Sequence, residues 1–523
     1  MKEMHLVFIA SVAIFLFNFD SALASFNIQQ DDLGSVPDLK QIAYVAMSPD
    51  CHDIAMVLRL GTGVELRVEG KVLATADEIP VAIYSPDGGR LVYAIRKGNS
   101  WSAVIDGKEI PAGTQPPTQL VFSPDGKHLC FVTTSAAGKK VVLDGVEQAM
   151  SYIDIGNLVV DDRDGQVHVA YAARTDKDQW VTVMDGKAVG KTYEFVDRVC
   201  LSPIAQHIAF VGCLDPDPNH ADRYEVVVEG KALGPYFSVT APPTFSPSDH
   251  LMFGACRAAG PMQAHLSHMY FPLNFFAVTD GFENNAIVHL GVGAQICRIF
   301  YCLGDTHLAL WTQGPYDPTG GGVHNKLVEE QPGTGDHLNM DGEDVQSLAG
   351  YVGANITLSP DGRQFALIQD LAQHSHPEQY AFRIDDRDGP GYFQAGPPLF
   401  SDDSSRCAYA AQRNSNPIGN RQGTDDSWFV VLQNAAKDDP VLESASGLLY
   451  PTVDADKDGF WHPDKYFGES GQTSIDNGHS YEGQIPYHFD PDGTLVYFRI
   501  ADGHLYRVHW NSKEPIAAAA TKP

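Results

Sequence analysis

The stretch that decides the fold runs from Leu120 to Gly145 and reads LVFSPDGKHLCFVTTSAAGKKVVLDG. It contains an apolar run, a Ser-Pro-Asp-Gly turn, a second apolar run, a polar loop and a third run that ends in Asp-Gly. In such a turn Pro fixes φ, Asp binds its own backbone, and Gly accepts a positive φ. The apolar runs are rich in Val, Leu, Phe and Thr, which favour strands. The stretch therefore predicts three successive antiparallel strands.

The same pattern recurs along the chain, in residues 81–107, 158–186 and 199–230. The turn prolines Pro49, Pro86 and Pro124 are 37 and 38 residues apart. The glycines that end the third run advance in step, with spacings of 37, 38, 41 and 44 residues: Gly70, Gly107, Gly145, Gly186 and Gly230. A period of about 40 residues is typical of propeller blades. We therefore expect an all-β protein, a β-propeller of about eight four-stranded blades, with two smaller propellers divided near residues 260–300 as the alternative.

The number of repeats can be counted from where each unit begins. Clear units begin near residues 42, 81, 119, 157, 198, 242, 354, 398 and 485. The irregular stretch 260–350 could hold one more, around Phe300-Tyr301 and residues 307–311. Since this exceeds the usual four to eight blades, the first and last segments could share one blade and close the ring.

The hairpins at Ser85–Gly88, Ser123–Gly126 and Ser359–Gly362 resemble the WD40-like (PD40) repeat of TolB-type β-propellers. The third-run endings Ile105–Lys108 and Val228–Lys231 are similar to those of bacterial proteins of this type. The resemblance covers most of residues 40–510, although the Trp-Asp ending of true WD40 repeats is absent. It implies a propeller and a secreted or periplasmic bacterial protein, but no particular activity, because propellers have many unrelated roles.

The N-terminus predicts export. Residues 6–19 are almost wholly apolar and precede Ala22-Leu23-Ala24, which fits a signal peptide cleaved after Ala24. The run is too short to span a bilayer comfortably. We therefore expect a signal peptide (1–24), a linker (25–40), the propeller (41–510) and a disordered tail (511–523), in a secreted or periplasmic protein without membrane insertion.

Charge and cysteine spacing exclude several classes of function. The formal net charge of −30 opposes binding to nucleic acid and to anionic membrane surfaces. The eight cysteines are scattered without a C-x-x-C motif, which argues against a zinc or redox centre. Their disulfide pairing stays open.

Three stretches are too long for blade loops: 313–346, 414–427 and 451–484. Long loops on a rigid scaffold often carry function. The third contains Asp454, Asp456 and Asp458 before Gly459, the opening of a D-x-D-x-D-G calcium loop. Position twelve is Lys465 rather than an acid, so Asp464 or Glu469 would have to complete a Ca²⁺ site. The alternative is a plain acidic turn.

Other polar clusters fit structural roles better than functional ones. The acidic runs 161–165 and 385–389 fall where hairpin turns are expected. The close pairs His374/His376 and His265/His268 are weak metal candidates among 20 histidines. No nucleophile elbow, H-E-x-x-H or P-loop occurs, so no catalytic residue and no cofactor apart from Ca²⁺ is predicted.

The sequence thus favours an exported non-catalytic scaffold that binds a protein, peptide or glycan partner. The alternative is a propeller enzyme, a lyase or glycan-active hydrolase, with its site at the channel mouth. His, Arg and carboxylates from different blades meeting within about 4–6 Å would favour the enzyme.

Overall fold

The computed structural model describes residues 28–36, 41–163, 165–176, 179–203, 207–214, 222–258, 263–265, 268–270, 273–284, 295–302, 307–313, 336–340, 343–348, 352–370, 380–385, 387–392, 394–412, 428–435, 442–444, 448–449 and 485–511. These residues form strands and tight turns and contain no α-helix, which confirms the all-β prediction. None of them belongs to a helix able to cross a membrane.

The described strands form ten consecutive blades, numbered here in chain order. Blade 1 contains β2 (Ile42–Met47), β3 (Ile54–Leu60), β4 (Gly63–Val68) and β5 (Lys71–Ala76). Blade 2 contains β6 (Ala82–Tyr84), β7 (Leu91–Lys97), β8 (Ser100–Ile105) and β9 (Lys108–Gly113). Blade 3 contains β10 (Thr118–Phe122), β11 (Leu129–Ser135), β12 (Gly138–Leu143) and β13 (Val146–Glu147), and a single parallel bridge, Gly113 to Thr134, links it to blade 2.

Blade 4 contains β14 (Asp154–Asp161), β15 (His168–Asp176), β16 (Gln179–Met184) and β17 (Lys187–Tyr193). Blade 5 contains β18 (Phe195–Leu201), β19 (Ile208–Cys213), β20 (Tyr224–Val228) and β21 (Lys231–Tyr236). Blade 6 contains β22 (Ser238–Phe245), β23 (Leu251–Ala258), β26 (Leu273–Thr279) and β27 (Phe282–Asn284), with the hairpin β24 (Gln263–His265) and β25 (His268–Tyr270) inserted.

Blade 7 contains β28 (Gln295–Cys302), β29 (His307–Gln313), β30 (Asp336–Met340) and β31 (Glu343–Leu348). Blade 8 contains β32 (Val352–Leu358), β33 (Phe365–Asp370), β34 (Tyr380–Ile384) and β35 (Arg387–Tyr392). Blade 9 contains β36 (Gln394–Ala395), β37 (Leu399–Phe400), β38 (Arg406–Gln412), β39 (Trp428–Asn434) and β40 (Leu442–Glu443). Blade 10 contains β41 (Tyr487–Phe489), β42 (Thr494–Ala501), β43 (His504–Asn511) and β1 (Ile28–Ser35).

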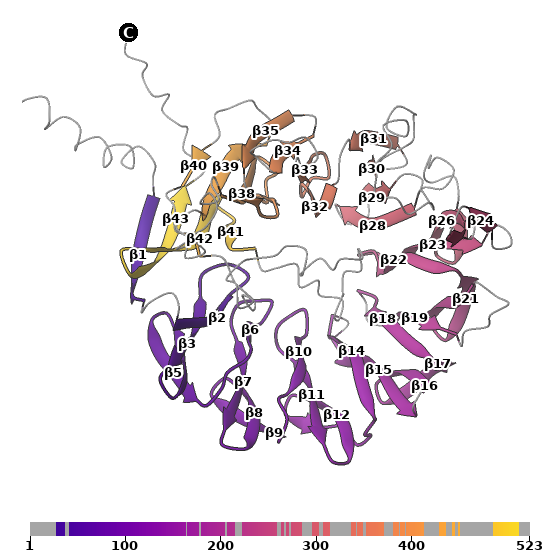
Figure 1. The fold of residues 1–523 in the computed structure, drawn as a ribbon, viewed down its shortest axis with the longest axis horizontal. Coiled ribbons are helices and arrows are strands. Elements are labelled where there is room, and N and C mark those ends of the chain that lie inside the picture. Colours follow the sequence, from indigo (N-terminus) through magenta and orange to yellow (C-terminus); the bar gives the residue numbers. More distant parts are fainter. Residues whose placement is uncertain are drawn as a thin grey trace, which may run out of the picture.

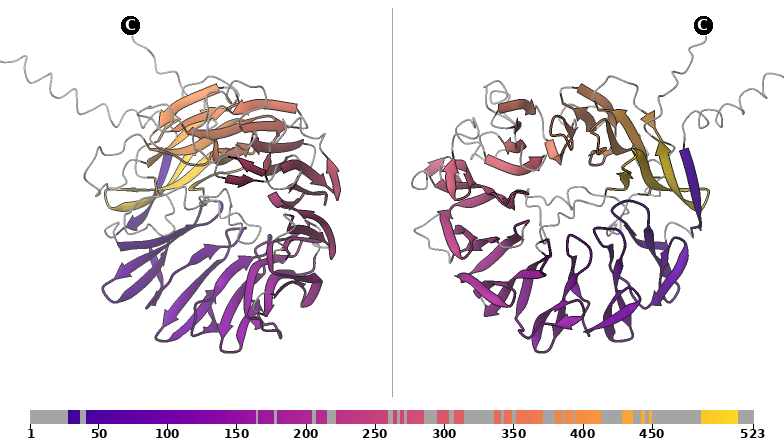
Figure 2. Two further views of the ribbon diagram at one scale, coloured as in Figure 1. Left: turned by 45° about the vertical axis from the view of Figure 1, so that its right-hand side comes forward. Right: turned by 180° about the vertical axis from the view of Figure 1, so that it is seen from behind.

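The blades are arranged in one ring, and the first strand closes it (Figures 1 and 2). The N-terminal strand β1 pairs antiparallel with the C-terminal strand β43, so both ends of the chain share blade 10. The alternative of two propellers placed a boundary near residues 260–300. Across this boundary, strands β22 and β23 of blade 6 contact β28 of blade 7. The chain is therefore a single propeller.

Three expectations about the layout need correction. The ten blades exceed the predicted number of about eight, because the irregular region around Phe300 is a full blade. The segment 25–40, expected as a linker, contains strand β1. The expected insertion 313–346 includes β30 and most of β31, because Asp341-Gly342 between them repeats the third-run marker seen in other blades.

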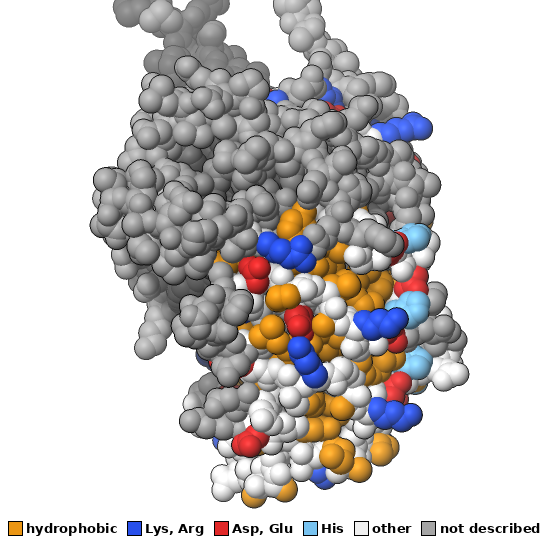
Figure 3. Space-filling view, turned by 90° about the vertical axis from the view of Figure 1, so that its right-hand side faces the viewer, with side chains coloured by type: hydrophobic (Ala, Val, Ile, Leu, Met, Phe, Trp, Pro, Cys, Tyr) orange, Lys and Arg blue, Asp and Glu red, His pale blue; other side chains and the backbone are white. Residues whose placement is uncertain are grey.

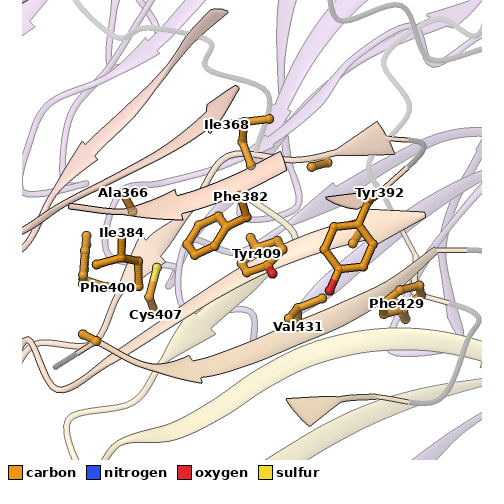
Figure 4. Packing of buried hydrophobic residues seen from close by; sticks show 13 residues of the cluster. Ala366, Ile368, Phe382, Ile384, Tyr392, Phe400, Cys407, Tyr409, Phe429 and Val431 are labelled. Atoms are coloured by element: carbon orange, nitrogen blue, oxygen red, sulfur yellow. The ribbon is translucent and has the colours of Figure 1, made fainter. Parts of the chain in front are cut away.

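The apolar core is divided among the seams between adjacent blades. One cluster joins Ala170 and Ala172 of blade 4 to Phe210 of blade 5. Another, shown in Figure 4, stacks Phe382 of blade 8 on Tyr409 of blade 9, with ring centroids 3.9 Å apart. Because a lone blade exposes both sheet faces, each blade is stabilised mainly by its two neighbours.

A repeated aromatic pair stabilises four of these seams. A tyrosine at or after the end of one blade's outer strand meets an aromatic ring on the second strand of the next blade. The ring centroids lie 5.7–5.9 Å apart and the planes meet edge-on, at 67–82°, which is a favourable aromatic geometry. The pairs are Tyr152–Tyr171, Tyr193–Phe210, Tyr236–Phe253 and Tyr392–Tyr409.

A buried serine organises each Ser-Pro-Asp turn. In blade 2 the Ser85 Oγ–H donates to Asp87 Oδ1 at 2.5 Å, and the Arg90 N–H donates back to Ser85 Oγ at 2.9 Å. The bond from Ser85 is the main cause that lowers the pKa of Asp87. Equivalent bonds form at four further turns: Ser48–Asp50, Ser123–Asp125, Ser359–Asp361 and Ser401–Asp403.

We predict that Ser85→Ala lowers the stability at neutral pH by about 1–3 kcal/mol, the cost of a buried hydrogen-bonding group left unpaired. Because the folded pKa of Asp87 lies below the ordinary value of 3.8, this carboxylate stabilises the protein above that pH. The stabilisation is lost as the pH falls through the folded pKa. Scanning calorimetry should therefore show a deficit in Tm at pH 7 that narrows at pH 3.

The matched control is Ser151→Ala, at an exposed serine between blades 3 and 4. Its Tm should match the wild type at both pH values. Equal losses in the two variants, or a Ser85→Ala deficit that widens at pH 3, would contradict the role given to the buried hydroxyl.

Candidate binding face

The ends of the strands divide the propeller into two unlike faces. In each blade the first-to-second and third-to-fourth connections lie at one end, and the second-to-third and blade-to-blade connections lie at the other. We call the first the turn face, because the Ser-Pro-Asp turns and the Asp-Gly turns form it. We call the second the loop face.

All three long insertions leave from the loop face. The first follows β29, the second strand of blade 7, and the next follows β38, the second strand of blade 9. The last lies between β40 and β41, on a blade-to-blade connection, and the inserted hairpin β24–β25 follows a second strand. The variation in length thus falls on one face, while the other keeps the repeat.

The turn face carries a ring of short, repeated polar contacts. In blades 3, 4 and 6 a histidine Nδ1 lies 2.7–2.8 Å from the aspartate of the Asp-Gly turn: His128–Asp144, His168–Asp185 and His250–Asp280. The second oxygen of each aspartate accepts the N–H of the residue after the histidine, at 2.9 Å. These aspartates have φ near 50°, as the first position of a type I′ turn requires. Figure 3 shows histidines beside acidic side chains along one edge of the molecule.

Two further His–Asp contacts on the turn face join different blades. His207 of blade 5 lies 2.6 Å from Asp249 of blade 6, and His52 of blade 1 lies 3.0 Å from Asp490 of blade 10. This is the proximity expected of an enzyme site. However, the pairs recur around the ring on the turn face, whereas a catalytic site occurs once, so we interpret them as structural.

In two blades an aspartate takes the place of the turn serine: Asp490 in blade 10 and Asp162 in blade 4. Asp162 faces Asp125 of blade 3. The hydrogen bond between these carboxyls is the main cause that lowers the pKa of Asp125. Burial, then the neighbouring Asp125, raises the pKa of Asp162. The two carboxyls thus lie close together across the seam between blades 3 and 4.

On the loop face, the seam between blades 4 and 5 carries partly exposed aromatic and cationic groups. The Arg174 guanidinium lies over the Trp180 ring at 5.8 Å. Trp180 in turn meets Phe195 of blade 5 edge-on, with centroids 5.5 Å apart, and Phe195 is 47% exposed. Trp180 and Leu214 pack on the buried cluster of this seam, which fixes the aromatic surface to the core.

Beneath this surface lies a buried polar contact. The Tyr193 O–H donates to Glu225 Oε2 at 2.9 Å, and Lys191 Nζ lies 3.0 Å from the same oxygen. Burial, then the neighbouring Glu225, raises the pKa of Tyr193, so its hydroxyl stays a proton donor. The contact holds the Tyr193 ring against blade 5.

The structure locates only some of the predicted site residues. The calcium candidates Asp454, Asp456 and Asp458, together with Asp464 and Glu469, lie outside the described residues, as do His374 and His376. His265 and His268 pair across the hairpin β24–β25. No group of three metal-ligating side chains occurs within the described ranges.

Each acidic run includes a turn, as predicted, although Asp161 ends strand β14 and residues 387–389 belong to strand β35. The Gly165 N–H donates to the Asp162 carbonyl at 2.9 Å. Asp385 has φ 51° between β34 and β35, and its side chain accepts the Phe365 N–H at 3.0 Å.

Six cysteines whose side chains the structure describes are free thiols: Cys51, Cys130, Cys200, Cys213, Cys256 and Cys407. Cys200 and Cys256 lie on strands, and burial raises the pKa of both to about 12. A thiol with a raised pKa is a poor nucleophile at neutral pH. These cysteines therefore serve as small apolar residues.

The sequence interpretation missed the Arg174–Trp180–Phe195 surface. The sequence did contain a signal for it. Tyr152, Tyr193 and Tyr236 recur at about the same spacing as the third-run glycines and mark the ends of blades. Phe195 lies two residues beyond one of these markers and so begins a blade on the loop face.

Comparisons with known proteins add little to the fold itself. No family model matches the sequence, and no curated protein matches it. A solved eukaryotic initiation factor is 9% identical, with 79% of this chain and 90% of that chain covered and a TM-score of 0.38. TolB from Acinetobacter baumannii is 18% identical, with 53% and 67% covered and a TM-score of 0.23. The Dos1 propeller is 9% identical, with 73% and 91% covered and a TM-score of 0.28. Likenesses this low carry no argument about function, and the PD40 resemblance stays a prediction.

Proposed function

We propose that this chain is an exported, non-catalytic β-propeller that binds a protein or peptide partner on its loop face. The observation that carries the proposal is the segregation of every long insertion to this face, opposite a turn face of repeated contacts. The described part of the loop face also presents Trp, Phe and Arg side chains. Aromatic residues and arginine are enriched where proteins bind one another.

A glycan partner is the second candidate within the same role, because aromatic rings next to polar groups also suit sugars. An enzyme is the alternative in another class. Its specific support is the pairing of His207 with Asp249 and of His52 with Asp490 across blades. Since both pairs lie on the repeated turn face, they favour a structural role.

The test uses photo-crosslinking from each face. A benzoylphenylalanine is placed at exposed Gln179 on the loop face, or at exposed Lys187 on the turn face as the control. Each protein is expressed with its full sequence and irradiated in its native compartment, and adducts are identified by mass spectrometry. We expect a discrete adduct from Gln179 and none from Lys187.

Equal adducts from both positions, or adducts only from Lys187, would refute a loop-face binding role. Turnover of a panel of polysaccharides and peptides by the purified protein, lost on His207→Ala, would instead support the enzyme.

A further inference from the structure

The loop-face end of the seam between blades 4 and 5, here called the Arg-aromatic seam, is formed by Arg174, Trp180, Phe195 and Arg223. Arg174, Trp180 and Phe195 are contiguous, because a single row of paired residues crosses blade 4. Arg174 pairs with Trp180, and Trp180 pairs with Tyr193, so their side chains share the side that faces blade 5. Phe195 then begins blade 5 against Trp180.

Among the described residues, both arginines of the seam make only long ion pairs. The Arg174 Nη2 lies 3.7 Å from Asp154, while Lys139 Nζ approaches the same carboxyl to 2.5 Å. The Arg223 Nη2 lies 3.5 Å from Glu194. A good charge-assisted hydrogen bond is about 2.7–2.9 Å. Asp154 is thus paired mainly with Lys139, and each guanidinium can still donate hydrogen bonds to another acceptor.

The Arg174 and Arg223 side chains are 33% and 36% exposed, so a ligand at the surface can reach them. Their Nε atoms are inaccessible to solvent, so any contact with a bound acceptor is made through the Nη groups.

We infer that the Arg-aromatic seam binds an extended peptide segment that carries an acidic side chain close to an aromatic or large aliphatic one. The apolar side chain covers the exposed ring of Phe195, and the carboxylate pairs with Arg174 or Arg223. Strands within a blade lie about 4.8 Å apart, so the row from Arg174 to Phe195 accommodates a few extended residues at about 3.4 Å each. This inference rests on the proposed loop-face function and specifies its partner.

The acidity of the whole chain does not prevent this. Charges separated by more than about 8–10 Å are largely screened at physiological salt. The contact is therefore governed by the local arginines, while the net charge of −30 acts mainly at long range. We expect the bound carboxylate to be replaced poorly by an amide, because charge-assisted hydrogen bonds are roughly twice as strong as neutral ones.

The test selects ligands from a phage-displayed library of random twelve-residue peptides on the full mature chain. Enriched peptides should carry Asp or Glu within two residues of Phe, Trp, Tyr or Leu. A synthetic peptide of that sequence should bind Phe195→Ser and Arg174→Gln about tenfold more weakly than the wild type. Replacing the acidic residue of the peptide by its amide should weaken binding to the wild type by a similar factor.

The chain offers close controls on the loop-face side of blade 1. Leu60 is 47% exposed, the same fraction as Phe195, and Arg59 is an exposed arginine beside it. Leu60→Ser and Arg59→Gln should bind the peptide within twofold of the wild type. Because Phe195 is half exposed, its variant should keep the wild-type Tm, which separates lost binding from lost folding.

Three results would overturn the inference. The enriched peptides could lack acidic residues, the seam and control variants could bind the peptide equally, or the protein could bind only to a glycan array. If crosslinking from Gln179 still yields a protein adduct that Phe195→Ser leaves intact, the inference fails and the loop-face function stands. If Gln179 yields no adduct at all, the loop-face function itself fails.

Discussion

Gly212→Ala is expected to lower the stability by about 1–3 kcal/mol, the usual cost of overpacking a core. An added Cβ at Gly212 would lie 2.4–2.7 Å from three carbons of the Tyr193 ring, far inside van der Waals contact. The ring cannot easily withdraw, because its hydroxyl is bonded to Glu225 and its edge packs on Phe210. Thermal unfolding should therefore show a clear fall in Tm.

The control is Gly156→Ala, at a strand glycine of blade 4 where an added Cβ meets nothing within 4 Å. That variant should stay within about 0.5 kcal/mol of the wild type. Gly212→Ala with an unchanged Tm would mean that blades 4 and 5 are less tightly packed than the structure indicates.

A double variant isolates the contact itself. Tyr193→Ala alone should cost about 3–5 kcal/mol, the range for removing a buried aromatic side chain. In that background the methyl of Gly212→Ala enters vacated space, so the second change should cost nothing or restore some stability. Additive losses would contradict a direct clash, since additivity is expected of sites that do not touch.

The strands of a blade could be predicted from the sequence repeat, because each repeated residue has a local structural role. The Asp of the Asp-Gly marker adopts a positive φ in a two-residue turn and caps the second strand with its carboxylate, as Asp144 does for Leu129. The serine of the Ser-Pro-Asp turn closes the other hairpin. Such signals depend only on neighbours in sequence, and they gave strand order without any knowledge of the ring.

The ring and the binding surface depend on contacts between blades, which a linear pattern does not contain. Strand β1 has few apolar residues, and its place is set by β43, far away in the sequence. Likewise, Trp180 and Phe195 resemble ordinary strand residues in the sequence, and only the packing of blade 4 on blade 5 brings them into contact. The number of blades also depends on how the ring closes. The count of sequence units therefore predicted it better than the usual number of blades in propellers did.

Removal of strand β1, by deleting residues 25–36, is expected to lower the free energy of unfolding by roughly 5 kcal/mol or more. The strand pairs with β43 from Ile28 to Ser35, and each net hydrogen bond contributes about 1 kcal/mol. Ile28 packs on the cluster between blades 9 and 10, and Leu33 on the one between blades 10 and 1. Calorimetry should show a large fall in Tm, and gel filtration should show association through the exposed edge of β43.

A synthetic peptide of residues 25–36 should restore the truncated protein in trans, because a ligand that binds only the folded state raises its stability by mass action. The control peptide carries Ile28→Ser and Leu33→Ser and keeps the backbone donors and acceptors. It should rescue poorly, since the strand is held by its apolar side chains as well as by the ladder. A truncated protein with the wild-type Tm would show instead that the cluster joining Val45 and Met47 of blade 1 to Phe498 of blade 10 closes the ring by itself.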